Sequence, residues 1–161
     1  MSDELIDWLR AQIEARKVVA EAAAREGDNP VWQDGGEYVY ADRDTYPGGT
    51  TYIAVGPWDG PVPDAVRAHL VLNDPRDVIA RCRAELAELD MIDAIPHQRV
   101  EDDDWWSCAQ ARDERGELAC GNDCRAGGPC DCGRDPLVSR LLRAKAYGYS
   151  HRPGWREEWR P

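Results

Sequence analysis

The feature that most constrains this chain is a run of cysteines in a segment rich in glycine and proline. Five of the six cysteines lie between residues 108 and 132, namely Cys108, Cys120, Cys124, Cys130 and Cys132. Structural zinc takes four ligands in a tetrahedron, and tight turns let the backbone curl around the ion. The segment therefore predicts a metal-binding loop. Free thiols in a loop, and a disulfide or redox pair, are the alternatives.

The cysteine spacing suggests which four would bind. Cys130 and Cys132 form a C-x-C hook, and without Cys124 the segment still offers two more distant cysteines. We therefore predict a structural zinc ion bound by Cys108, Cys120, Cys130 and Cys132, with Cys124 as the alternate ligand. The remaining cysteine, Cys82, falls on the apolar face of an expected helix and is predicted to be a buried thiol.

The N-terminal half of the chain shows helical and then alternating patterns. Residues 3–25 predict a helix, because Leu5, Trp8, Leu9, Ile13 and Val19 recur near helical spacing. Residues 31–55 alternate with period two around a Pro-Gly-Gly loop, which predicts a small antiparallel hairpin or sheet.

Two Asp-Pro pairs predict helix starts, because aspartate caps a helix and proline tolerates its first position. Asp74 and Pro75 predict a helix that runs to about residue 93, preceded by a short helix over residues 63–72. Asp135 and Pro136 predict a C-terminal helix that ends near Gly148.

These elements predict an α+β fold. It comprises three main helices, a small antiparallel hairpin or sheet, and an irregular cysteine-rich loop before the C-terminal helix. We expect one domain over residues 1–161. Its parts are a helix–hairpin–helix region (1–95), the cysteine-rich insertion (96–134) and the C-terminal helix with its tail (135–161).

Charge and composition restrict the partners. A net charge of −11 disfavours direct binding to nucleic-acid phosphates and favours a basic protein partner. Acids stand where a signal peptide has bases, and no apolar run is long enough to span a bilayer. We therefore expect a cytoplasmic protein with reduced cysteines. The acidic run 101–104 predicts a solvated loop. Trp105, Trp106, Trp155 and Trp159 are expected to pack in a core or an interface.

No motif supports an enzyme. The P-loop, the dinucleotide-binding glycine motif and the nucleophile elbow are all missing. The "PCDC" stretch resembles half of a zinc deaminase motif. The H-x-E half is missing, because neither His69, His97 nor His151 has a glutamate two residues later.

Several longer motifs resemble a family of short proteins of unknown function from actinobacteria and their phages. They are the opening "DELIDWLRAQIEA", the central "RAHLVLNDPRDVIARC", the "WSCAQ" segment with a loop ending in "CDCGRD", and the closing "WREEWRP". The chain departs from the family pattern at Leu72, Asn73 and Trp155. The resemblance implies Cys108, Cys120, Cys130 and Cys132 as the shared cysteines, and it implies no reaction, substrate or cofactor.

The sequence thus predicts a bacterial or phage accessory protein that has a structural zinc site and acts by binding a protein. One specific form is an acidic DNA mimic that inhibits a host DNA-binding protein. The alternative is a thiol-based redox protein or metal-dependent enzyme that uses the cysteine cluster.

Overall fold

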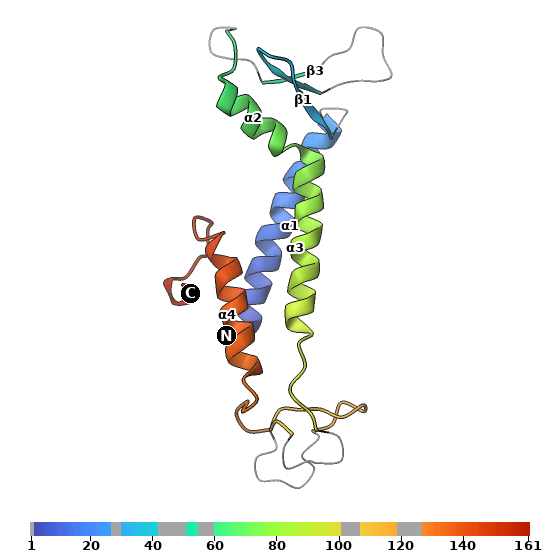
Figure 1. Cartoon of the computed structure of the whole chain (residues 1–161), viewed down its shortest axis with the longest axis vertical. Coiled ribbons are helices and arrows are strands. Elements are labelled where there is room, and N and C mark those ends of the chain that lie inside the picture. The colour runs from blue at the N-terminus through green and yellow to red at the C-terminus, as the bar shows by residue number, and fades with distance from the viewer. Residues whose placement is uncertain (1, 27–29, 42–50, 55–59, 101–106, 119–126) are drawn as a thin grey trace. The chain divides into compact units, whose positions relative to one another are not determined.

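The computed structural model describes residues 2–26, 30–41, 51–54, 60–100, 107–118 and 127–161 (Figure 1). Its helices are α1 (Ser2–Glu26), α2 (Asp64–Leu72), α3 (Pro75–Asp93) and α4 (Arg134–Tyr147), followed by a short 3₁₀ turn, η2 (Glu157–Trp159). Its strands are β1 (Trp32–Asp34), β2 (Val39–Ala41) and β3 (Thr51–Ala54). The predicted α+β class is confirmed.

The three strands form one antiparallel sheet in the order β1-β2-β3. Trp32 pairs with Ala41 and Tyr40 pairs with Tyr52, and an irregularity between Val39 and Tyr40 shifts the register of the second pair of strands. The antiparallel pairing of β2 with β3 was predicted, whereas β1 was not identified as a separate strand. The predicted Pro-Gly-Gly loop lies outside the described residues.

The chain divides into two compact units. The first comprises Met1–Leu9 and Glu88–Pro161, and the second comprises Arg10–Ala87. The single-domain organisation expected from the sequence stays a prediction. Of the helices in the described ranges, none has the length and apolarity required to cross a membrane.

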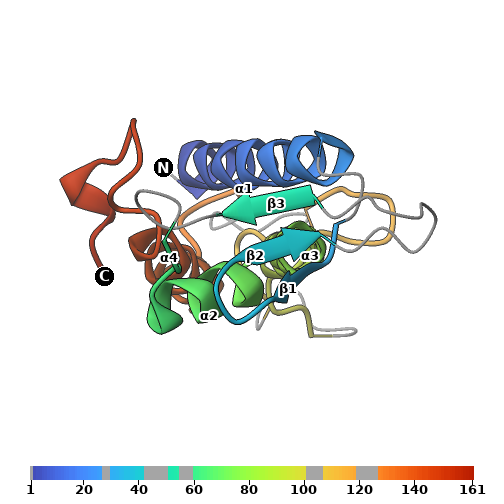
Figure 2. The same ribbon diagram turned by 90° about the horizontal axis from the view of Figure 1, so that it is seen from above.

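Within the second unit, the sheet and α2 are joined by the buried side chain of Arg67. Arg67 Nε donates to Asp34 Oδ1 at 2.6 Å, and Nη1 donates to the Val62 carbonyl at 2.8 Å. Figure 2 shows α2 running close to β1 and β2. The buried apolar side chains among the described residues of this unit include Ile13, Ala20, Val39, Ala41, Val62 and Cys82.

Cys82 is fully buried on α3, as predicted. The guanidinium of Arg16 donates to its sulfur at 3.1 Å and also to Glu85 at 2.7 Å. The expected apolar face of α1 is wrong at Val19, which is 69% exposed while Ala20 is buried.

The first unit packs the start of α1 against the C-terminal tail. Its buried apolar residues include Leu5, Leu9, Leu89, Val138, Leu142, Ala146 and Trp159. The indole of Trp8 contacts both tail tryptophans, with ring centroids 6.0 Å from Trp155 and 5.1 Å from Trp159, and those two rings also contact each other at 6.0 Å. This packing holds the C-terminal tail, which follows α4, against the start of α1. It confirms that Trp155 and Trp159 pack with other side chains.

Candidate metal centre

Four side chains with metal-binding atoms converge between α3 and α4. They are His97, Cys108, Cys130 and Cys132, and their ligand atoms all lie within 4.8 Å of one another. All four belong to the first compact unit. Cys108 is buried and the other three are half-buried. One ion placed among these atoms would reach all four.

Three of the six separations among these atoms are close to the edges of a tetrahedron around zinc, and all six are within 4.8 Å. With Zn–S of about 2.3 Å and Zn–N of about 2.0–2.1 Å, two sulfurs lie about 3.8 Å apart and a sulfur and a nitrogen about 3.6 Å apart. Here the sulfurs of Cys130 and Cys132 are 3.6 Å apart. The Nδ1 atom of His97 lies 3.6 Å from Cys108 Sγ and 3.8 Å from Cys132 Sγ. The donor set therefore fits zinc in both chemistry and spacing.

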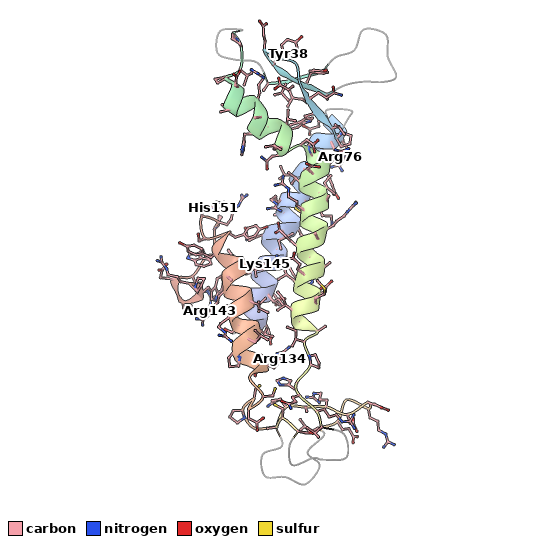
Figure 3. The ribbon with its side chains drawn as sticks, viewed as in Figure 1. Tyr38, Arg76, Arg134, Arg143, Lys145 and His151 are labelled. Atoms are coloured by element: carbon pink, nitrogen blue, oxygen red, sulfur yellow. The ribbon has the colours of Figure 1, made fainter. Side chains whose placement is uncertain are left out.

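His97 is positioned by hydrogen bonds on both sides of it. The Arg134 guanidinium, at the start of α4, donates to the carbonyls of Asp93 and Ile95 at 2.9 Å each. After His97, the carbonyl of Gln98 accepts the backbone N–H of Cys108 at 2.8 Å. Figure 3 labels Arg134 at the end of α4 that adjoins these loops. The segment is thereby held to both α4 and the loop of Cys108.

The loop of Cys108 is joined to the chain that leads into the C-x-C hook. The backbone N–H of Gly127 donates to the Ala109 carbonyl at 2.8 Å, and the Gln110 side chain donates to the Gly128 carbonyl at 2.5 Å. Ala109 N–H also reaches Asp131 Oδ1 at 3.4 Å. These contacts bring Cys108 beside Cys130 and Cys132 despite the distance along the sequence.

The hook ends at Cys132, and only Gly133 separates it from the first residue of α4, Arg134. Gly133 has φ of +81°, which an L side chain rarely adopts, and this conformation turns the chain from Cys132 into the helix. The Gly133 carbonyl accepts the N–H of Leu137 at 3.2 Å. Cys132 is therefore fixed directly to the start of α4.

Backbone N–H groups point at two of the sulfurs. Gln98 N–H reaches Cys132 Sγ at 3.4 Å, and the N–H of Arg134, two residues after Cys132, also donates to it. The sulfur of Cys108 accepts in the same way from Gln110, again two residues later. Such donors stabilise a thiolate, which is the form that binds metal.

The two thiols respond differently to this environment. Burial raises the pKa of both, but the N–H donors of Gln98 and Arg134, together with His97, lower the pKa of Cys132 to about 6. For Cys108, burial dominates and its pKa is raised. Of these two thiols, Cys132 is therefore the more readily ionised at neutral pH.

The cluster has a path to solvent. His97 and Cys132 line an open cavity of about 600 Å³, whose wall also contains Arg99, Arg112 and Arg134. An ion or a small reagent can reach the sulfur of Cys132 through this opening.

A family model described as a family of unknown function, DUF6221, matches residues 2–161. The chain belongs to the DUF6221 family. No curated protein and no solved structure shows significant similarity to it. The expectation of a family of unknown function is thus confirmed, whereas the actinobacterial or phage source stays a prediction.

In this DUF6221 protein, three of the predicted ligands lie together, namely Cys108, Cys130 and Cys132. Cys120 and Cys124 lie outside the described residues, so the role of Cys120 as a ligand stays a prediction. The acidic run 101–104, Trp105 and Trp106 also lie outside the described residues.

His97 was not among the ligands predicted from the sequence. It was considered there only as a possible half of a deaminase motif, and the predicted ligands were all cysteines. A signal was present, because His97 follows Pro96 just after the end of the long helix and is separated from Cys108 by a linker of loop length. A search for Cys₃His sets would have included it.

Proposed function

We propose that this DUF6221 protein is a non-enzymatic accessory protein whose first unit is stabilised by a structural zinc ion. The ligands in this proposal are His97, Cys108, Cys130 and Cys132. The observation that supports it is the convergence of one imidazole nitrogen and three sulfurs within 4.8 Å. Three thiolates with one imidazole in tetrahedral spacing favour zinc over hard cations, which prefer oxygen.

A structural role follows from the number of protein ligands. Catalytic zinc sites have three protein ligands and keep a fourth position open for water or substrate. Four protein ligands close that position. The ion would then act by holding the His97 segment, the Cys108 loop and the start of α4 together, so that binding energy becomes folding energy.

The test is zinc content measured by mass spectrometry on protein purified without a metal-affinity tag. We expect about one zinc per chain. Cys130→Ser and His97→Asn should lose it, because each removes one of four ligands, whereas Cys120→Ser and the matched control Cys124→Ser should retain it.

The same variants distinguish the ligand set that contains His97 from the four-cysteine set that contains Cys120. If Cys120→Ser loses zinc while His97→Asn keeps it, the four-cysteine set predicted from the sequence is correct. If the wild-type protein purifies without metal and acquires none from added zinc, the structural zinc proposal fails.

A thiol-based redox protein is the second candidate, and one observation favours it. Cys132 has a pKa lowered to about 6, is half-buried, and has the sulfur of Cys130 only 3.6 Å away. Low pKa together with access is typical of reactive cysteines. Rapid labelling of Cys132 by a thiol probe in the zinc-loaded protein would favour this candidate. Slow labelling that accelerates after chelation would favour the structural ion.

We further propose that the protein is cytoplasmic, is encoded by a bacterium or phage, and acts on a basic protein partner. The support is the net charge of −11, which attracts a positively charged surface. Mimicry of DNA is a narrower form of the same idea. It stays a prediction from the sequence.

A further inference from the structure

The two ring nitrogens of His97 face different groups. Nδ1 faces the sulfurs of Cys108 and Cys132, at 3.6 and 3.8 Å. Nε2, on the other side of the ring, lies 3.7 Å from Oδ1 of Asp135. The ring therefore stands between the cluster of sulfurs and a carboxylate from the first turn of α4.

This arrangement bears on which nitrogen binds a metal. A neutral imidazole has one nitrogen with a free lone pair and one that carries the proton, and the group facing each nitrogen decides which is which. A carboxylate attracts the N–H, so Asp135 favours the proton on Nε2 and leaves the lone pair on Nδ1. In metal sites, such a carboxylate also fixes the ring orientation and makes the ligand more basic.

We propose that Asp135 is a positioning residue that orients His97 for zinc binding through Nδ1, an inference that rests on the zinc site proposed above. At 3.7 Å the contact is longer than a hydrogen bond, but it is within the distance at which a carboxylate and an imidazole interact electrostatically. The carboxylate therefore acts on the ring directly. Its side chain is half exposed.

Arg134 brings His97 and Asp135 together. Its Nη1 donates to Asp135 Oδ1 at 3.1 Å, while its Nε and Nη2 donate to the carbonyls of Ile95 and Asp93. One guanidinium thus contacts both the segment that carries His97 and the carboxylate that faces its ring. This explains why the aspartate of the second Asp-Pro pair does not cap its helix. The helix begins at Arg134, with Gly133 in the N-cap position and no side-chain cap.

The experiment compares zinc affinity, by chelator competition, in the wild type, Asp135→Asn and Asp135→Glu. Loss of such an outer-shell carboxylate weakens metal binding by about 10–100-fold, which is the effect we expect for Asp135→Asn. Asp135→Glu should restore most of the affinity, because it keeps the carboxylate. Both variants keep the four direct ligands.

A second measurement distinguishes positioning from general stability. Long-range ¹H–¹⁵N NMR of the zinc-loaded wild type should show His97 with its proton on Nε2 and the metal on Nδ1. Metal on Nε2, or unchanged zinc affinity in Asp135→Asn, overturns the role of Asp135 while the zinc site stands. A wild-type protein that binds no zinc overturns both proposals.

Discussion

Arg67 shows how a single buried charge organises the second unit. Only 9% of this residue is exposed, yet its guanidinium has partners in three directions. They are Asp34 in β1, the Val62 carbonyl, and Asp64, at 3.0 Å, at the start of α2. A buried guanidinium without such partners would be strongly destabilising, so these contacts fix α2 beside β1.

The acid sensitivity of this contact can be predicted from Asp34. The backbone N–H of Gly36 and the guanidinium of Arg67 hold the pKa of the Asp34 carboxyl below its usual value of 3.8. A lowered pKa stabilises the folded protein above that value, and the contribution is lost as the pH falls through the folded pKa. In urea unfolding between pH 6 and pH 3, Asp34→Asn should be less stable than wild type at pH 6. The difference between the two should shrink below about pH 4.

Asp64→Asn is the control for that experiment, because Asp64 touches the same guanidinium while its side chain is 96% exposed. Its effect should be much smaller, as for surface ion pairs in general. A constant difference between wild type and Asp34→Asn from pH 6 to pH 3 would show that the carboxylate charge of Asp34 does not stabilise the fold.

At the scale of elements, the two Asp-Pro pairs show what local sequence can and cannot predict. The prediction for α3 is confirmed. Pro75 is its first residue, and Asp74 Oδ1 accepts the N–H of Asp77 at 2.7 Å. The prediction for α4 is wrong at its start. The helix begins at Arg134, and Asp135 turns toward His97.

The physical reason lies in the backbone N–H groups of the first turn, none of which has a hydrogen-bond partner within the helix. Proline lacks this N–H, so it loses no helical hydrogen bond at any position in that turn. Pro136 therefore fits the third position of α4 as well as the first. Local rules cannot distinguish these positions. The contacts of Arg134 with Asp93 and Ile95 and the left-handed Gly133 decide between them, and those contacts depend on the tertiary fold.

The C-terminal tail, which includes the closing "WREEWRP" segment, is bonded to the start of α1. Trp8 Nε1 donates to the Pro153 carbonyl at 3.1 Å, and Arg156 donates to the carboxylate of Glu4. The sequence predicted that Trp155 and Trp159 pack with other side chains. It could not identify their partners at the start of α1, because these lie about 150 residues earlier in the chain. The tail forms only the short turn η2.

A substitution at Gly154 tests how closely the tail packs against Trp8. It has φ of +82°, and a Cβ there would lie 2.9 Å from Trp8 Nε1, which the tail tryptophans hold in place. Gly116 has φ of +81° and open space around it, so it is a matched control. Gly116→Ala should cost about 1–2 kcal/mol for the left-handed backbone alone. Gly154→Ala should cost about 1–3 kcal/mol more in chemical denaturation, because the indole must move. Equal losses of stability in the two variants would mean that the Trp8 indole moves aside at no measurable cost.

For the molecule as a whole, every described residue of the candidate metal centre belongs to the first unit, while the sheet and α2 belong to the second. A zinc ion bound by His97, Cys108, Cys130 and Cys132 would therefore stabilise one unit directly. The core of the other unit rests on Arg67 and on apolar side chains such as Val39 and Cys82. The composition could not predict this division, because it depends on which distant residues touch.

Zinc removal should accordingly affect the two units unequally. In hydrogen exchange after addition of a chelator, we expect amides in the first turn of α4 and around Cys108 to lose protection by about tenfold or more, since local opening no longer has to break metal bonds. Amides in β2 and in α2 should change little. Cys130→Ser should show the chelated pattern without a chelator, and zinc added back to the chelated wild-type protein should restore its protection. Equal loss across both units would mean that the ion stabilises one cooperative structure, and no change in either would show that the cluster folds without metal.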